Sequence, residues 1–509
     1  MSYLSLAYFA VFLPVFLIIY QISPQKYRWC VLLAANYVFF FIASRFLVLW
    51  IFAETFFTFL AGKKLGTMKR GDMDRKAFKK KKSNILKYSV IALLAVLIAL
   101  KYTNFFGKII FSAAGKTYHP LNILVPIGIS YYTLMGISYL VDVKNGKYAC
   151  AEHFGKFALY MSFFPTIMEG PIARWNDYGP QLSEGKPVTA ENLAHGYERI
   201  LWGLFKKLTI ADHLAVAVST VYSSYPDNGA MVLFVAVACT LQLYMDFAGS
   251  IDVVIGTGEI LGITIPENFR QPFFAKDAGD FWRRWHISLG AFMRDYIFYP
   301  VSLSKPVMKL SKWTKAHVGN TAARFIGPVI ALLLVWLSNG FWHGPNVVYI
   351  LYGIYYFFFM SLELFIKAPL DKFYEKHNIT DNTPWLKVLR FFKMAVIVCY
   401  GEMFFAAETL SKVCLMTKSI FTNFQLRIAL HQLTNLGMDS YDFIQIFICF
   451  LPVIIVDVMA EKGINLKEAF DRKPLIFRWT LLLLTVFAVV MFGAYGPGYG
   501  TAGMMYAGF

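Results

Sequence analysis

Long apolar segments recur along the whole chain and are separated by short polar stretches. A membrane-spanning helix needs about 20 apolar residues, because each residue contributes about 1.5 Å to the crossing. Segments of this kind are 4–22, 28–43, 46–62, 86–106, 122–141, 154–169, 199–222, 230–261, 323–342, 347–366, 390–408, 442–459 and 475–493. Lipid offers the backbone no hydrogen-bond partners, so each segment is expected to be a helix.

Two apolar runs contain places where a helix is expected to break. The run 28–62 is too long for one span and is expected to fold as two helices. The run 230–261 contains Gly249 and Gly256, and either is a candidate for a break. The first 22 residues lack the positive start and cleavage site of a signal peptide, which indicates an uncleaved helix. We predict an all-α polytopic integral membrane protein with roughly ten to thirteen membrane-embedded helices, some of them re-entrant.

The composition agrees with a membrane protein rather than a soluble one. Hydrophobic residues make up 57% of the chain and charged residues only 16%, whereas a soluble domain is about 25% charged. No linker rich in Ser, Gly or Pro divides the chain, so a single membrane domain over 1–509 is expected. The six cysteines form no CxxC pair, so neither a disulfide framework nor a metal site is predicted.

The net charge of +18 is concentrated in segment 63–87, which holds eleven Lys or Arg residues. Basic segments between spans stay on the cytoplasmic side and attract anionic lipid headgroups. We therefore predict that 63–87 is a cytoplasmic loop, and three preceding spans place the N-terminus outside. A nucleic-acid site would interleave aromatic residues with the basic ones. Only Phe78 and Tyr88 lie near this cluster, so nucleic acid is not an expected partner.

His343 is the ionisable residue whose position most strongly suggests chemistry. It follows the apolar segment 328–342 and precedes Gly344 and Pro345. A lone histidine there is more often structural, but ionisable residues at membrane depth are costly and mark functional sites. Gly340 and Gly344 permit close backbone approach, and Pro345 ends the helix. These features are typical of a cavity opened at membrane depth.

The segment 281–300 mixes aromatic and charged residues, including Arg283, Arg284 and Trp285. It is too charged to span a membrane and too aromatic for a solvated loop. An interfacial or re-entrant helix is therefore expected, with Trp and Arg at the level of the headgroups. The alternatives are a simple interfacial anchor and a functional segment in which His286 faces inward.

Two carboxylates, Asp246 and Asp252, interrupt the apolar segment 244–256. They are six residues apart, so they lie on different helix faces and do not form a catalytic acid–base pair. Internal ion pairs that fix helix packing are the expected role, and one carboxylate is expected to pair with Arg283 or Arg284. Walker, GxSxG, HExxH and Rossmann motifs are absent from the sequence in usable form.

Several segments together resemble the membrane-bound O-acyltransferase family, in the bacterial polysaccharide branch that includes alginate O-acetyltransferase membrane subunits. The segments occur in the family's order. They are 125–143, 163–182, 203–215, 243–256, 266–300 with WRRWHIS, 337–345 with NGFWHG, and the aromatic tail 492–509.

The resemblance implies a ring of helices around a central tunnel, with a catalytic core over 125–345. It implies that His343 is the catalytic base and that His286 is a second essential histidine. Asn339 lies one helical turn before His343 and is a candidate oxyanion donor or orienting group. Lys206 and Lys207, with Arg283 and Arg284, would suit a basic rim for an anionic donor; the two lysines are also read as snorkelling from a helix end.

The reaction implied is transfer of an acetyl group from a cytoplasmic thioester, acetyl-CoA or an acyl carrier, to an extracytoplasmic polysaccharide. No bound cofactor or metal is expected. Expected partners are membrane lipids and an exported acetyltransferase, and the expected location is the bacterial inner membrane. Two alternatives stay open: D-alanyl transfer to teichoic acid within the same family, and a transporter or flippase, since broken helices also mark those proteins.

Overall fold

The computed structural model describes residues 3–495, and almost all regular structure in this range is helical. The single β interaction within the range is an isolated bridge between Phe269 and Trp285. Within residues 3–495, seven helical segments are long and apolar enough to cross a membrane: Gln25–Thr67, Arg75–Lys101, Gly229–Ile260, Asn320–His343, Val347–Lys376, Ser440–Glu461 and Leu475–Phe492. The prediction of an all-α polytopic membrane protein is therefore confirmed. The predicted ring and tunnel stay predictions, and residues 496–509 of the aromatic tail lie outside the described residues.

The chain divides into two compact units. Unit 1 comprises Met1–Ile200 and Ser250–Glu267, and unit 2 comprises Leu201–Gly249 and Asn268–Phe509. The helices that begin in unit 1 are η1(Tyr8–Phe12), α1(Leu13–Ile22), α2(Gln25–Ser44), η2(Arg45–Leu47), α3(Val48–Thr67), α4(Arg75–Lys101), α5(Thr103–Ala113), α6(Ile129–Asn145), α7(Phe154–Met161), α8(Trp175–Tyr178), η3(Gln181–Ser183) and α9(Ala190–Lys206).

The remaining helices begin in unit 2. They are η4(Lys207–Ala211), α10(Asp212–Ser224), α11(Gly229–Ile260), η5(Pro272–Phe274), α12(Ala278–Arg284), α13(Ile287–Met293), η6(Arg294–Phe298), α14(Tyr299–Ser302), α15(Lys305–His317), α16(Asn320–His343), α17(Val347–Lys376), α18(Pro384–Ala406), α19(Leu410–Thr422), α20(Leu426–Gln432), η7(Leu433–Asn435), α21(Ser440–Glu461), α22(Leu466–Asp471) and α23(Leu475–Phe492). Of α11, the last third belongs to unit 1.

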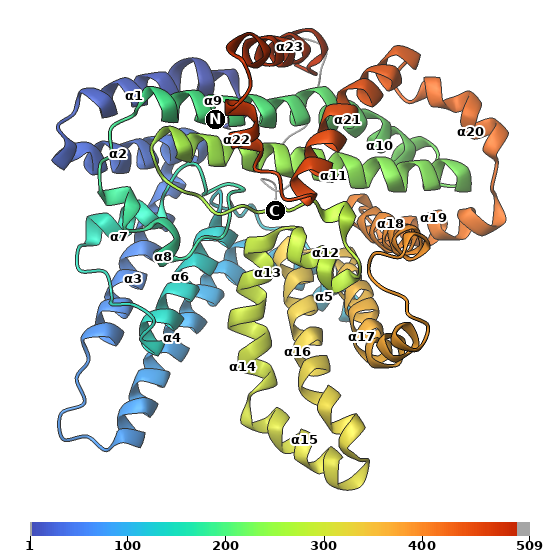
Figure 1. Cartoon of the computed structure of the whole chain (residues 1–509). Coiled ribbons are helices and arrows are strands. Elements are labelled where there is room, and N and C mark those ends of the chain that lie inside the picture. Colours follow the sequence, from blue (N-terminus) through green and yellow to red (C-terminus); the bar gives the residue numbers. More distant parts are fainter. Residues whose placement is uncertain (1–2, 496–509) are drawn as a thin grey trace. The chain divides into compact units, whose positions relative to one another are not determined.

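In unit 1 the long run 28–62 folds as two helices, as predicted. The chain turns at Arg45, which adopts a left-handed backbone with φ of 52° between α2 and α3. The basic segment 63–87, however, is not an extended loop. Helix α3 continues to Thr67 and α4 starts at Arg75, so most of the basic residues lie on helix ends (Figure 1).

Two other helix predictions were wrong. The segment 154–169 is not a span, because α7 ends at Met161 and the next residues run irregularly past Pro165. The run 230–261 is not broken at Gly249 or Gly256, since α11 is continuous. These glycines serve close packing instead. A Cβ at Gly249 would come within 2.7 Å of the carbonyl oxygen of Gly203, which leaves no room for a side chain.

In unit 2 a long helical hairpin carries both candidate histidines. The chain runs outward through α13, η6 and α14, turns through α15, and returns along α16 (Figure 1). His286 precedes the first residue of α13, and His343 is the last residue of α16. The hairpin therefore brings residues that are 57 positions apart (343 minus 286) back to the same end of the unit.

Candidate active site

His343 is buried at the C-terminus of α16, with 2% of its surface exposed. The helix ends where Gly344 and Pro345 follow, and α17 begins at Val347. This is the break predicted from the sequence. Close backbone packing at Gly340 is also confirmed, because a Cβ there would overlap the carbonyl oxygen of Tyr349. The Gly-Pro break thus places a titratable ring inside the protein at a helix end.

Aromatic rings surround His343. Its ring centroid lies 4.9 Å from that of Phe405 on α18, in a T-shaped arrangement, and 5.6 Å from that of Tyr352 on α17. The ring of the preceding Trp342 lies at 5.1 Å. These contacts restrict the orientation of the imidazole to one that the three helices define.

His286 lies at the sharp junction between α12 and α13. Its backbone is left-handed, with φ of 48°, which is uncommon for a residue with a side chain. Asn268 holds the junction from the side, because its carbonyl oxygen accepts the N–H of Ile287 at 3.0 Å and its side-chain oxygen accepts the N–H of Ser288 at 2.9 Å. Residue strain of this kind persists only where surrounding contacts enforce it, and it gathers at functional sites.

The same asparagine contacts Nδ1 of His286 through its side-chain amide. Its Nδ2 lies 3.2 Å from Nδ1 of His286, whereas its Oδ1 is farther, at 3.4 Å, and accepts from Ser288. We assign the closer contact as a hydrogen bond from Nδ2 to Nδ1, and this assignment places the ring proton of the neutral imidazole on Nε2. Burial lowers the pKa of His286, which lies outside the seven candidate spans, to about 3. His286 is therefore neutral at physiological pH.

Trp342 joins the two histidines into one site within unit 2. Its ring lies 5.4 Å from the ring of His286, and it is the chain neighbour of His343. On the other side of His286, Phe247 packs against the ring at 4.8 Å. The inward orientation considered for His286 is confirmed, since only 2% of the residue is exposed.

Asn339 shares the buried end of α16 with His343. It lies four residues earlier, so both side chains project from neighbouring positions on one helix. Asn339 is 5% exposed, and its Oδ1 has no hydrogen-bond partner among residues 3–495. A buried amide oxygen without a hydrogen-bond partner is costly, which fits a group that binds a ligand.

The arginines of segment 281–300 do not pair with the carboxylates of α11, contrary to the prediction. Arg284 binds Asp280 and Glu461, with Nη1 2.7 Å from Glu461 Oε2. Arg283 lies 3.4 Å from Asp280 and is largely exposed. Asp280 and Glu461, both in unit 2, are acidic partners of these arginines. Trp285 is a core residue, 1% exposed, and its ring stacks on Phe281 at 5.5 Å.

Lys207 is part of a buried ion cluster rather than an exposed rim. Its Nζ lies 2.5 Å from Asp212 Oδ1 and 2.6 Å from Asp246 Oδ1, and all three residues are at least nine-tenths buried. Lys206 is also buried, with its ammonium 5.9 Å from the ring of Trp202. Lys207 does not need to reach the solvent, because Asp212 on α10 and Asp246 on α11 neutralise its charge inside the protein. The predicted packing role of Asp246 is confirmed.

Asp252 has a separate partner within unit 1. Its Oδ1 accepts a hydrogen bond from Nε of Arg199 on α9 at 2.6 Å, and Arg199 also binds Glu267 at 2.9 Å. Asp252 therefore joins α9 to the end of α11. This ion pair, like that of Asp246, agrees with the predicted role in helix packing.

Sequence reasoning missed four residues around the two histidines. They are Asn268, Tyr352, Glu402 and Phe405. For Glu402 a signal was available, because it is a carboxylate inside the predicted span 390–408, and an ionisable residue at membrane depth is a functional candidate by default. The other three are recognisable only from contacts between helices.

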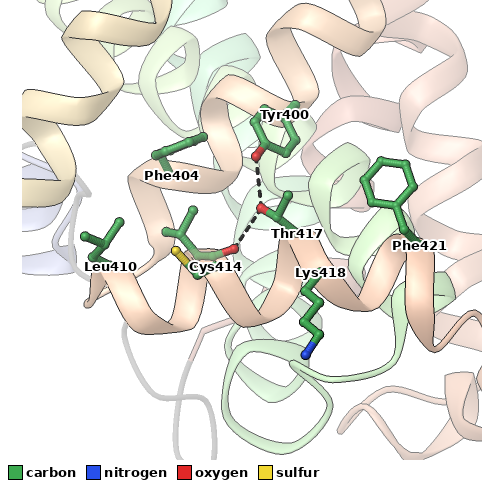
Figure 2. A pocket seen from close by; sticks show the side chains of 8 residues that line it. Tyr400, Phe404, Leu410, Cys414, Thr417, Lys418 and Phe421 are labelled. Atoms are coloured by element: carbon green, nitrogen blue, oxygen red, sulfur yellow. Dashed lines mark hydrogen bonds between the residues drawn. The ribbon is translucent and has the colours of Figure 1, made fainter.

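A groove of 390 Å³ lies elsewhere in unit 2, between α18 and α19. Figure 2 shows its lining residues, among them Tyr400 and Thr417, whose hydroxyl oxygens are 2.9 Å apart. Neither of the two histidines lines this groove, and Asn339 does not line it either. The groove is thus distinct from the cluster that carries the candidate chemistry.

Comparisons with known proteins identify a family that the chain resembles over most of its length. The sequence profile of the membrane-bound O-acyltransferase family matches residues 152–403. The chain is 31% identical over 426 residues to the probable alginate O-acetylase of Pseudomonas aeruginosa, covering 83% of this chain and 75% of that protein. It is 32% identical over 429 residues to the protein of the same name from Azotobacter vinelandii, covering 83% and 78%.

Two further relatives have different names. The peptidoglycan O-acetyltransferase of Helicobacter pylori is 27% identical over 362 residues, covering 65% of this chain and 63% of that protein. The teichoic acid D-alanyltransferase of Bacillus subtilis is 29% identical over 292 residues, covering 57% and 70%.

Proposed function

Because this chain belongs to the membrane-bound O-acyltransferase family, it is a multi-pass membrane enzyme that transfers acyl groups, and we propose that it O-acetylates an extracytoplasmic polysaccharide. The alginate and peptidoglycan relatives are named for O-acetylation of cell-envelope polymers, which supports an acetyl group and a sugar hydroxyl. Membership of an acyltransferase family favours this reaction over the alternative of transport without chemistry.

His343 is the base in this proposal. A neutral imidazole accepts the proton of the acceptor hydroxyl, and the hydroxyl oxygen attacks the carbonyl carbon of an acyl thioester. A C–O bond forms, the tetrahedral intermediate collapses, and the C–S bond breaks. The leaving thiolate takes the proton back from His343, so the base is regenerated.

Two other groups stabilise the oxyanion of the tetrahedral intermediate. Asn339 has a buried amide one turn from His343, and the Nδ2 of such an amide is a donor. His286, neutral and protonated on Nε2, is a second donor within the same cluster. Preorganised donors in a site without bulk water are worth more than the same donors in water.

The donor is proposed to be a cytoplasmic thioester, acetyl-CoA or an acyl carrier protein. The membrane separates such donors from an external polymer, so the site would admit the thioester from one face and the acceptor hydroxyl from the other. We infer the bacterial inner membrane, with 63–87 in the cytoplasm and the N-terminus outside. An exported acetyltransferase is the proposed partner that completes delivery. Labelling of an Asp72→Cys protein from the cytoplasmic side alone would support this orientation.

The observation that carries the proposal is the pair of buried histidines joined through Trp342. The test is acetyl transfer to polymer in membrane vesicles with His343→Ala protein. Loss of a general base is expected to lower the rate by about 10²- to 10⁴-fold. The exposed His317 supplies a matched control, since His317→Ala should retain the rate. Full transfer by His343→Ala protein would overturn the proposal.

D-alanyl transfer to teichoic acid is the second candidate, because a relative of that name is 29% identical over 292 residues. The two reactions share the base and differ in the donor. Vesicles supplied with acetyl and D-alanyl thioesters in parallel distinguish them. Preference for the acetyl donor supports O-acetylation, and preference for the D-alanyl donor supports the alternative.

A further inference from the structure

Glu402 is a fully buried carboxyl in the last turns of α18. It is 0% exposed, and it belongs to none of the ion pairs recorded among residues 3–495. Its neighbours on α17 are instead two tyrosines. The phenol oxygen of Tyr352 donates to Glu402 Oε1 at 3.1 Å, and that of Tyr356 donates to the same oxygen at 3.2 Å.

These two phenols connect Glu402 with the candidate base. Tyr352 contacts Glu402 through its hydroxyl and His343 through its ring, at 5.6 Å. Phe405 lies three residues after Glu402 on α18, and its ring contacts His343 at 4.9 Å. The end of α18 thus reaches the ring of His343 in two ways, directly through Phe405 and indirectly through Tyr352.

Stability alone is a poor explanation for a carboxyl in this place. A buried carboxyl costs free energy even when it is hydrogen-bonded, and apolar residues of similar volume often replace such groups without loss of stability. Moreover, Oε2 of Glu402 has no hydrogen-bond partner among the described residues. The hydrogen bonds to Tyr352 and Tyr356, however, fix the rotation of both rings, which an apolar residue cannot do.

We propose that Glu402 is a positioning residue for His343, acting through Tyr352. By accepting both phenol O–H groups at one oxygen, it holds the ring of Tyr352 against the imidazole and so keeps the base in its reactive orientation. The inference rests on the proposed function, because it presumes that His343 is the base. It predicts that the geometry of the acceptor oxygen matters and that its negative charge does not.

The experiment compares purified full-length variants for kcat and KM in acetyl transfer, per folded protein. Glu402→Leu removes the acceptor and is expected to lower kcat by about 10²-fold with little change in KM, since a shift of about 1 Å in a reacting group has that effect. Glu402→Gln keeps an acceptor oxygen and is expected to stay within about threefold of wild type. Tyr352→Phe should lower kcat in the same way as Glu402→Leu, and the double variant should be no worse than Glu402→Leu alone.

Tyr355→Phe is the matched control. Tyr355 also lies on α17 and donates its phenol O–H to α18, but to the backbone oxygen of Ile397 at 2.8 Å. Its loss removes one hydrogen bond between the same two helices without involving Glu402. We expect wild-type kcat for this variant. A loss equal to that of Tyr352→Phe would mean that helix packing alone explains the effect, and would overturn the proposal.

Other outcomes are equally decisive. Wild-type kcat in Glu402→Leu, or a Glu402→Gln protein as inactive as Glu402→Leu, would contradict a positioning role. Should Glu402→Leu not fold, Tyr352→Phe decides, because wild-type kcat there would overturn the proposal. An active His343→Ala protein would reject the proposed function itself. An inactive His343→Ala protein beside fully active Glu402 and Tyr352 variants would reject only this inference.

Discussion

The ring of Trp342 lies 5.4 Å from the ring of His286, although His286 precedes the first helix of the hairpin and Trp342 lies in its last helix. Trp342 also precedes His343 in the chain, so a single indole ring contacts both imidazole rings. The backbone of α16 and the strained junction at His286 together determine this contact. A change in α16 or at the junction before α13 would therefore alter the positions of both imidazole rings.

An Asn268→Asp substitution is expected to reverse the tautomer of His286. A carboxylate can still accept the N–H of Ser288, but it cannot donate to Nδ1, so the ring proton moves to Nδ1. Nε2 then loses its proton, and a donor to the oxyanion disappears. We expect kcat to fall about 10²-fold while the protein remains folded. Assays of acetyl transfer and thermal unfolding check both parts, and unchanged kcat would contradict the assigned tautomer.

Acid is expected to destabilise the protein partly through His286. The pKa of the folded group is about 3, whereas that of the unfolded group is near its usual value of about 6.5. Between these values the unfolded state binds a proton that the folded state does not, so stability falls as pH decreases from about 6.5 towards 3. The slope is at most about 1.4 kcal/mol per pH unit. In detergent, unfolding temperatures of His286→Gln protein should decline less steeply over this range than those of wild type. Parallel curves would contradict the depressed pKa.

Removal of the charge at Lys207 is expected to destabilise unit 2. Lys207→Met leaves Asp212 and Asp246 buried without their shared cation. Breaking a buried ion pair from one side costs about 3–5 kcal/mol. The measurement is the yield and unfolding temperature of the detergent-solubilised variant. Adding Asp212→Asn and Asp246→Asn to Lys207→Met should restore part of the loss, because no charge is then left buried. No rescue would argue against the ion cluster as the cause.

A methyl group at Gly256 is expected to separate α9 from the end of α11. A Cβ there would come within 2.5 Å of the carbonyl oxygen of Gly196, which cannot move without its helix. The overlap costs about 1–3 kcal/mol and weakens the pair of Arg199 and Asp252. Gly327→Ala on α16 is the control, since its Cβ would have no atom closer than 3.4 Å. Equal unfolding temperatures for the two variants would contradict the close helix contact.

The sequence was sufficient for features that depend on one segment at a time. The apolar run 323–342 predicts α16 to within three residues, and 442–459 predicts α21 to within two. Hydrophobic length decides such ends locally, and in α16 the following Gly344 and Pro345 also end the helix. The histidine pair was predicted through resemblance, and the structure independently places both rings against Trp342.

Features that depend on partners from other segments could not be predicted. One of Asp246 and Asp252 was expected to pair with Arg283 or Arg284. Asp246 pairs with Lys207 and Asp252 with Arg199 instead, because ion pairs depend on which helices pack together. The role of a glycine in a helix also depends on other segments. Gly256 reads as a possible break in isolation, but in the structure it permits a helix contact, and α11 continues through it.

The hairpin from α13 to α16 also constrains how the length of the chain can change. One residue inserted into α16 would rotate every later residue by about 100° and advance it by about 1.5 Å. Trp342 would then turn away from His286, and His343 from Phe405. Insertions at α15, by contrast, leave the register of α16 intact. Related chains of unequal length should therefore differ at the outer turn of the hairpin and agree in the number of residues along α16.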